Sequence, residues 1–227
     1  MKILAIDHTR AHPSQWVLRL DDGTACVLDE ATIVAEQLAV GDELSQADLD
    51  RIRSASAERG LLDAAMRFLG TRPRSRAEVR RRLQRPRQGK PAPDPEAVER
   101  VLDRLATLGL LSDRGFAEFW VENRDQFSPR SARAMRQELA LRGVDRETLD
   151  ATVDSGLDEE RALTAARQRL RSLTGLDYPA FASRLNGFLL RRGFGYGVTR
   201  DTVRALWQEA HGDLPEDANE EPEVGDQ

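Results

Sequence analysis

The stretch at residues 109–144, GLLSDRGFAEFWVENRDQFSPRSARAMRQELALRGV, determines the fold that we predict for most of the chain. Its first half predicts a helix that begins after Ser112, because a serine hydroxyl can accept a hydrogen bond from a free backbone N–H at a helix start. Side chains at helical spacing then form a mostly aromatic stripe along one face. The stripe contains Phe116, Phe119, Trp120 and Asn123.

The second half of this stretch predicts two further helices. Ser128 and Pro129 are expected to end the first helix and to begin the second, with the serine as N-cap and the proline in the first turn. Gly143 is expected to end the second helix in a left-handed conformation, and Asp145 is placed to cap the third. The apolar face predicted for the second helix contains Ala132, Met135, Leu139 and Leu141.

The same pattern recurs along the chain. The motif R-S-x-x-x-[V/M]-R-x-x-L occurs at residues 74–83 and, 56 positions later, at residues 130–139. A weaker copy follows after 50 further positions, where Leu185 and Leu189 occupy the apolar sites and Gly193 ends the copy. Each copy has an apolar helical pattern before and after it. This indicates three-helix units that must stack, because each buries little apolar surface alone.

We therefore predict a mainly α fold, with three tandem three-helix repeats in an elongated curved array. A small extension that contains an antiparallel β-hairpin precedes the repeats. Prolines interrupt the first repeat at a loop, which we interpret as an insertion, the alternative being a basic arm that touches DNA or a partner. The predicted boundaries are 1–60 for the extension, 61–111, 112–157 and 158–210 for the repeats, 85–95 for the loop and 211–227 for an acidic, disordered tail.

The extension alternates apolar and polar residues over residues 2–9 and 15–29, as half-buried strands do. The sequence Asp-Asp-Gly at residues 21–23 is a hairpin turn signal. A short helix is expected at residues 30–38. A second helix is expected to start at Ser45, with a capping-box-like arrangement, and to run toward residues 59–60.

Composition excludes several classes of protein. The single cysteine, Cys26, excludes an intramolecular disulfide framework and fits a reducing compartment. The N-terminus lacks the apolar segment of a signal peptide, and no run reaches the roughly 18 apolar residues of a membrane helix, so we expect a cytoplasmic protein. The net charge of −5 is unevenly distributed: −5 in residues 1–60, +7 in residues 61–210 and −7 in residues 211–227. The predicted helical body is therefore basic.

No pattern in the sequence indicates catalysis. His8 and His12 are four positions apart, but strand and turn sequence surrounds them, so they cannot share a helix face as metal ligands. Glycines at positions 193, 195 and 197 follow a helix rather than a strand and lack the lysine of a phosphate-binding loop, so a helix connector explains them better. We expect no enzyme activity, no metal and no cofactor.

Arginines are the strongest functional signal. Seven of them fall within residues 74–87, where Glu78 is the one acid. Three more, at positions 130, 133 and 136, are expected to form one exposed stripe of a helix. Such clusters suit an acidic partner or phosphate groups. The candidate binding residues are Arg74, Arg76, Arg80, Arg81, Arg130, Arg133, Arg136, Arg142, Arg191 and Arg192.

The string G-L-L-x-D-x-x-F-A-x-x-W-V-x-x-R, followed by a helix that ends in E-L-x-x-R-G-V, resembles the RecX family of recombination regulators. Most of the matching side chains are helix-packing residues, so the resemblance identifies a fold before an activity. The matching residues are Gly109, Leu110, Leu111, Asp113, Phe116, Ala117, Trp120, Val121, Arg124, Glu138, Leu139, Arg142 and Gly143.

This resemblance covers about residues 60–210 and implies a function. It implies binding in the groove of the RecA filament on single-stranded DNA, and modulation, usually inhibition, of ATP hydrolysis and strand exchange. The setting would be DNA recombination, DNA repair and the SOS response, and we expect a monomer. The alternative is a helix-turn-helix-like protein that binds DNA directly, because three-helix units and a basic excess also fit phosphate contacts.

Overall fold

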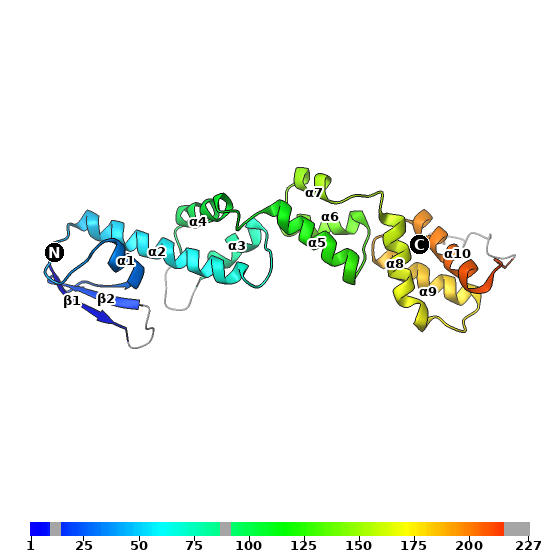
Figure 1. Ribbon diagram of the computed structural model, residues 1–227, viewed down its shortest axis with the longest axis horizontal. Helices are drawn as coiled ribbons and strands as arrows, with labels where there is room; N and C mark the ends of the chain where they lie inside the picture. Colours follow the sequence, from blue (N-terminus) through cyan, green and yellow to red (C-terminus); the bar gives the residue numbers. More distant parts are fainter. Residues whose placement is uncertain (10–14, 87–91, 216–227) are drawn as a thin grey trace, which may run out of the picture. The chain divides into compact units, whose positions relative to one another are not determined.

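The computed structural model describes residues 1–9, 15–86 and 92–215. His12, residues 87–91 of the proline-rich loop and the acidic tail from residue 216 onward lie outside the described residues. The chain forms two compact units, Met1–Ser112 and Asp113–Gln227. The first unit contains the β-sheet and one three-helix domain, and the second contains two three-helix domains (Figure 1).

The N-terminal extension folds into the predicted antiparallel sheet, with strands in the order β1-β2-β3. Gly23 lies in the turn between β2 and β3 with a φ of 83°, a left-handed conformation that glycine adopts without steric cost. One face of the sheet is apolar and packs against Leu49 and Ile52 of the following long helix. Cys26 is buried in this core. The strands are β1 (Ile3–His8), β2 (Gln15–Leu20) and β3 (Ala25–Asp29).

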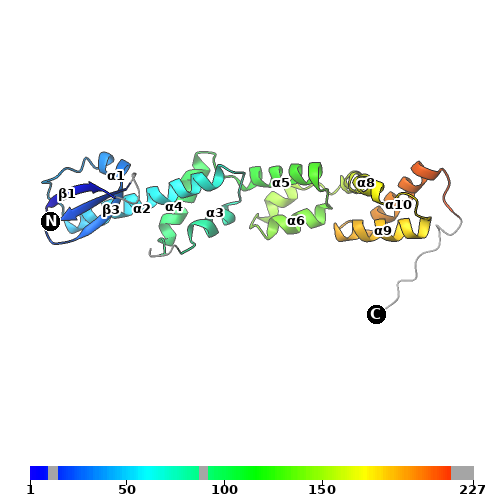
Figure 2. The ribbon, with the colours of Figure 1, turned by 90° about the horizontal axis from the view of Figure 1, so that it is seen from below.

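The long helix α2 (Gln46–Leu69) follows the short helix α1 (Glu30–Ala35). Its start confirms the predicted capping box, because Ser45 and Asp48 exchange side-chain and backbone hydrogen bonds. The predicted end near residues 59–60 is wrong: the helix continues through Gly60, where one exposed glycine costs only about 1 kcal/mol. α2 therefore belongs both to the sheet's core and to the first three-helix domain (Figure 2).

The first three-helix domain combines the end of α2 with α3 (Arg76–Leu83) and α4 (Pro95–Thr107). Ser75 caps α3 in a capping box with Glu78, and Asp94 caps α4 directly before Pro95. Proline suits the first helical turn because its missing N–H would have no partner there. Side chains from the three helices form one apolar core, which contains Val79, Leu83, Val98, Val101, Leu102 and Leu105.

The second three-helix domain consists of α5 (Asp113–Phe127), α6 (Ala132–Ala140) and α7 (Arg146–Thr152). The predicted start of α6 is wrong, because Ser131, not Ser128, is the N-cap and its hydroxyl accepts from the backbone of Ala134 at 3.1 Å. Leu141 is also misassigned: it is 74% exposed, since it lies about 200° around the helix from the buried Leu139.

The end of α6 and the start of α7 confirm the predicted caps. Gly143 has a φ of 84°, and the N–H of Val144 donates to the carbonyl oxygen of Leu139 at 3.2 Å, as in a Schellman motif. The side chain of Asp145 accepts from the backbone N–H of Thr148, which caps α7. The core of this domain contains Phe116, Ala117, Ala132, Met135, Leu139, Val144, Leu149 and Val153.

The third three-helix domain consists of α8 (Asp158–Arg169), α9 (Tyr178–Arg191) and α10 (Tyr196–His211), with a short 3-10 turn, Leu170–Ser172, after α8. The glycines that follow α9 form a helix connector, as predicted. Gly193 has a φ of 89°, and Gly195 is the N-cap of α10. Around the core, Trp207 packs edge-on against Tyr178 and Phe181.

Hydrogen bonds join the second and third domains inside the second unit. The backbone N–H of Ser131 donates to the carbonyl oxygen of Arg192 at 3.2 Å. The backbone N–H of Ala132 donates to the side chain of Asp158 at 2.7 Å. Gly193 fits closely in this junction, because a Cβ there would lie 2.7 Å from Oγ of Ser131. The two domains therefore present side chains to one shared surface.

Candidate functional site

Each three-helix domain carries an aromatic ring with two guanidinium groups over it. In the first domain, Arg74 lies 4.2 Å and Arg82 6.0 Å from the centre of the Phe68 ring. Guanidinium groups at such distances are attracted to the negative face of the ring. The corresponding groups are Arg142 at 3.9 Å and Arg124 at 4.7 Å from Trp120, and Arg192 at 4.5 Å and Arg169 at 5.6 Å from Phe188.

In the second domain, one carboxylate organises the arginines around Trp120. Glu138 of α6 accepts from Nε1 of Trp120 at 2.8 Å and from Nε of Arg124 at 2.9 Å. Arg130 lies 3.1 Å from the other oxygen of Glu138. Trp120 is half-buried: one side of it packs on the core, and its indole N–H donates to Glu138 in this polar network.

The third domain contributes Arg192 to the same region. Its Nη1 donates to Oγ of Ser128 and to the carbonyl oxygen of Pro129, both at 3.0 Å. Burial lowers the pKa of Arg192, and the neighbouring cations of Arg130, Arg124 and Arg169 lower it further. The guanidinium groups of Arg124, Arg130 and Arg169 are therefore each close enough to repel that of Arg192.

We name these four residues, Arg124, Arg130, Arg169 and Arg192, the arginine cluster. Within the described residues, the ion pairs of the arginine cluster involve Glu138 alone. Four positive charges thus share one negative charge across two domains. An arrangement of this kind is stabilised by an anion that neutralises the excess, and guanidinium groups match the oxygens of phosphates and carboxylates.

The predicted candidates in the first domain are differently arranged. Arg76 of α3 lies 3.0 Å from Glu99 and 2.6 Å from Asp103, both on α4. Arg80 forms two hydrogen bonds with Glu99, at 2.5 and 2.9 Å, and these bonds lower the pKa of Glu99 to about 2. The expectation that this arginine segment has only Glu78 as a neutralising acid is therefore wrong, because α4 supplies the partners.

Other candidates in the first domain remain at the surface. Arg81 is exposed and donates from Nε to the carbonyl oxygen of Ala77 at 3.2 Å. Arg74 is half-buried over Phe68, and burial, together with the cation of Arg72, lowers its pKa. Neither residue belongs to the arginine cluster, so this domain offers single cations rather than a focused site.

The predicted stripe of arginines in the second domain does not form. Arg130 precedes the N-cap of α6, so it is outside the helix and turns toward Glu138. Arg136 donates to the carbonyl oxygen of Val153 at 2.5 Å and lies 3.7 Å from Asp150. Only Arg133 is exposed as expected. In the third domain, Arg191 is likewise exposed, on the residue before Arg192.

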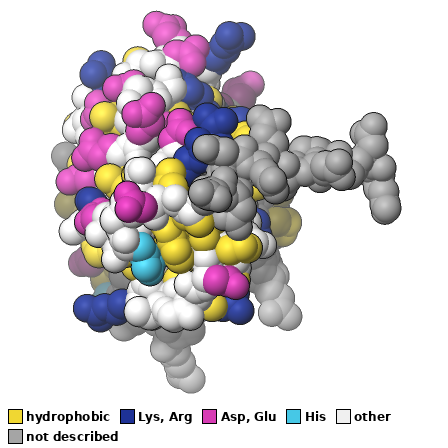
Figure 3. Space-filling model, turned by 90° about the vertical axis from the view of Figure 1, so that its right-hand side faces the viewer, with side chains coloured by type: hydrophobic (Ala, Val, Ile, Leu, Met, Phe, Trp, Pro, Cys, Tyr) yellow, Lys and Arg dark blue, Asp and Glu magenta, His cyan; other side chains and the backbone are white. Residues whose placement is uncertain are grey.

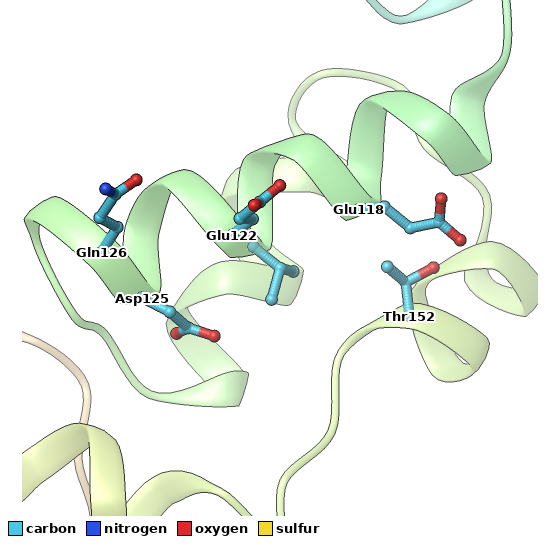
Figure 4. Close-up of a pocket in the computed structure, with 6 residues that line it drawn as sticks. Glu118, Glu122, Asp125, Gln126 and Thr152 are labelled. Carbon is cyan, nitrogen blue, oxygen red and sulfur yellow. The ribbon is translucent and has the colours of Figure 1, made fainter.

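The opposite face of α5 is acidic. Glu118, Glu122 and Asp125 follow the spacing i, i+4, i+7, which places them on one side of the helix, while Trp120 and Arg124 occupy the other. Figure 4 shows these carboxylates spread along α5, with Glu118 beside Thr152 of α7, and together they line a shallow groove of about 600 Å³. Glu118 is paired with Arg114 and Asp125 with Arg161, so the excess charge that attracts an anionic partner lies at the arginine cluster and not at this groove.

Sequence reasoning missed part of the cluster. Arg124 and Glu138 carry the family resemblance, but the sequence does not mark them as binding residues. Arg169 gave no signal, because an arginine in the last turn of a helix usually interacts with the helix dipole. The signal that could have identified Arg124 is its position four residues after Trp120, which places the two side chains on one helix face.

The described residues show neither a metal site nor a membrane span. In that part of the chain, no three His, Cys, Asp or Glu side chains are grouped as metal ligands would be. No helix of the described segments combines the length and the apolar character needed to cross a membrane. On the face drawn in Figure 3, basic and acidic side chains are interspersed and not gathered into one patch.

Comparison with protein-family models agrees with this domain organisation. The model described as "RecX, first three-helix domain" matches residues 62–85. The models for the second and third three-helix domains of RecX match residues 112–153 and 158–203. The arginine cluster falls within the last two of these ranges.

Individual proteins give the same result. The chain is 37% identical over 145 residues to "Regulatory protein RecX" of Mycobacterium sp. (strain KMS), a match that covers 61% of this chain and 76% of that protein. It is 25% identical over 227 residues to the protein of the same name from Listeria monocytogenes, covering 99% and 80%. A structure described as "Crystal structure of regulatory protein RecX" shares the fold, with a TM-score of 0.61 at 20% identity over 87% of this chain and 96% of that one.

Proposed function

The chain belongs to the RecX family of regulatory proteins, and from this premise we propose that it binds the RecA filament on single-stranded DNA and inhibits RecA. The proposed effects are slower ATP hydrolysis and slower strand exchange during recombination and DNA repair. The protein would act in the cytoplasm as a binding protein and would need no cofactor.

The arginine cluster is the observation that carries this proposal. It holds four guanidinium groups on two domains with one shared carboxylate, Glu138. A filament of protein on DNA offers repeated phosphates and acidic side chains, which complement such a surface over a long distance. Ion pairs at the edge of an interface mainly raise the association rate and fix the orientation, so the cluster would steer the protein onto the filament.

The proposed inhibition follows from differential affinity. A binding protein shifts an equilibrium between two states only by the difference in its affinity for them. A RecX-type protein that binds one conformation of the filament more tightly would slow the cycle in which RecA hydrolyses ATP. The same preference would hinder the addition of further RecA subunits if the bound protein blocks the filament end.

A second candidate function is direct binding to DNA without RecA. The arginine cluster supports it as well, because guanidinium groups bind backbone phosphates of any sequence. Sequence-specific binding by α6 is not favoured, because of its two candidate arginines Arg136 is held by Val153 and Asp150, which leaves Arg133 alone exposed. Direct binding would therefore be of the non-specific, salt-sensitive kind.

The test is the ATPase activity of RecA on single-stranded DNA, titrated with the full chain at two salt concentrations. The proposal predicts inhibition at less than one molecule per RecA subunit and weaker inhibition at the higher salt concentration. An unchanged ATPase, together with salt-sensitive binding of the chain to naked DNA, would favour the second candidate.

A further inference from the structure

Phe127, the last residue of α5, is an exposed aromatic side chain beside the arginine cluster. Its exposed fraction is 65%. Trp120, Arg124 and Phe127 follow the spacing i, i+4, i+7, so Phe127 extends the aromatic and basic face of α5 and points away from the acidic groove on its other side. An exposed phenylalanine at this position has no role in the core of the domain.

Phe127 is also adjacent to the anchor of Arg192. The next two residues, Ser128 and Pro129, accept both hydrogen bonds from Nη1 of Arg192. Arg130 follows directly and pairs with Glu138. Phe127 therefore lies within three residues of Arg130 and directly before the two residues that bind Arg192.

The ring of Phe127 differs from the other aromatic rings near the cluster. Guanidinium groups lie over Trp120 and Phe188, whereas in the described part of the chain none lies over Phe127. With most of its side chain exposed, the ring is accessible to a ligand. Aromatic rings next to basic grooves bind single-stranded nucleic acids by stacking on the bases, a contact that every base can make.

The surroundings of Phe127 favour a nucleic acid over a protein partner. A hot-spot aromatic in a protein interface lies in a desolvated pocket among apolar neighbours. Phe127 is flanked in the sequence by Gln126 and Ser128, both polar, and the hydroxyl of Ser128 binds the cation of Arg192. A duplex would not use the ring, because its bases are stacked on one another inside the helix.

We propose that Phe127 stacks on a base of single-stranded DNA whose adjacent phosphates bind the arginine cluster. This inference rests on the proposed function and adds to it a direct contact with the DNA strand, made by a named residue. The protein would then bind single-stranded DNA without sequence preference. Recognition would combine phosphate contacts, which any nucleic acid offers, with one stacking contact, which only an unpaired base offers.

The experiment measures binding of the full chain, without RecA, to three fluorescent probes of equal length: an oligothymidine, an abasic strand and a duplex. Replacing Phe127 with Leu is expected to weaken oligothymidine binding roughly 5- to 150-fold, the loss of one stacked base. Phe127→Tyr should retain binding. Leu141→Ala, a change of an exposed apolar residue elsewhere in the same domain, should alter it less than about twofold.

The abasic strand and the duplex separate stacking from other effects of the substitution. Wild type and Phe127→Leu should bind these two probes equally, because neither offers an unpaired base. Equal weakening of all three probes by Phe127→Leu, or a wild type that binds oligothymidine no better than the abasic strand, would overturn the inference. Circular dichroism and a thermal melt would check that the variant is folded.

Different results would refute this inference and the proposed function. A wild type that inhibits RecA but does not bind oligothymidine would overturn the stacking contact and leave the regulatory function in place. A wild type that binds oligothymidine through Phe127 but leaves the RecA ATPase unchanged would support the contact and remove the regulatory function.

Discussion

Arg161 of α8 forms two hydrogen bonds with Asp125 of α5, from Nε to Oδ1 at 2.7 Å and from Nη2 to Oδ2 at 3.1 Å. Arg161 is only 5% exposed, so this pair is a buried connection between the second and third three-helix domains. The same guanidinium also donates to the carbonyl oxygen of Asp154. Together with the contacts of Arg192, it holds the two halves of the arginine cluster in one unit.

Replacing Arg161 with Leu should destabilise the second unit. The change leaves the carboxylate of Asp125 without its partner, and breaking a buried ion pair in this way costs roughly 3–5 kcal/mol, less here because Asp125 is partly exposed. Urea denaturation would measure the loss. Arg167→Leu is the matched control, because its pair with Glu209 is exposed on both sides and should contribute less than about 1 kcal/mol. Equal effects of the two changes would contradict the assignment.

Gly193→Ala should also destabilise the junction between these domains. A Cβ would lie 2.7 Å from Oγ of Ser131 and 2.8 Å from Cβ of Ala134, and the φ of 89° is unfavourable for alanine. We expect a loss of roughly 2–4 kcal/mol from backbone strain and steric overlap. Gly175→Ala separates the two causes, because its φ of 78° is similar but the space around it is open, so roughly 1 kcal/mol should be lost. If the two variants lose the same stability in a thermal melt, the steric overlap of the new Cβ with Ser131 and Ala134 must be relieved by local adjustment.

Replacing Glu138 with Gln should lower the free energy of unfolding of the second three-helix domain by roughly 1–3 kcal/mol. The reason is that three groups lose a charged acceptor: Trp120, Arg124 and Arg130. It should also increase the affinity for anionic partners, since the arginine cluster loses its one neutralising charge. Denaturation and oligonucleotide binding would measure the two effects. The control is Glu122→Gln on the acidic face of α5, which should change stability by less than about 0.5 kcal/mol. A less stable variant with lower affinity would contradict this assignment.

The stability of the first unit depends on pH through the carboxylate of Glu99. Hydrogen bonds from Arg80, and then from Arg76, hold the pKa of Glu99 at about 2, below its usual value of 4.5. The stabilisation is therefore present above about pH 4.5 and is lost as the pH falls through 2. Because Arg80 and Glu99 are partly exposed to solvent, their ion pair contributes about 1 kcal/mol or less to the free energy of unfolding.

The replacement Glu99→Gln tests this dependence in urea denaturation at several pH values. The wild type should lose stability relative to the variant between pH 5 and pH 2, and the two should converge at the acid end. A stability difference that stays constant with pH would show that the carboxylate does not act through its charge.

The parts of this fold that depend on local chemistry were predictable from the sequence. Gly143 and Gly193 end helices because their φ angles are left-handed, and Asp145 caps α7 through its own side chain. The three-helix repeats follow from the spacing of apolar residues, and the family models match all three. Each of these signals lies within a few residues of the structure that it produces.

Features that depend on neighbouring helices were not predictable in the same way. The local pattern predicts Ser128 as the N-cap of α6, but in the structure the hydroxyl of Ser128 accepts from Arg192 of the third domain and Ser131 caps the helix. The partners of Arg76 and Arg80 come from another helix, more than 15 residues along the chain. The arginine cluster likewise forms only when the third domain brings Arg192 to the second, which no local pattern reveals.

The measurement that tests the account most directly compares two double variants in the RecA ATPase assay on single-stranded DNA. The first, Arg124→Gln with Arg130→Gln, removes two charges of the arginine cluster. The second, Arg114→Gln with Arg146→Gln, removes two exposed charges elsewhere in the same domain. We predict that the wild type and the second variant inhibit RecA alike, and that the first needs at least about tenfold more protein, the loss of about 1.4 kcal/mol of binding energy. Equal inhibition by both variants, with both folded, would contradict the role of the arginine cluster.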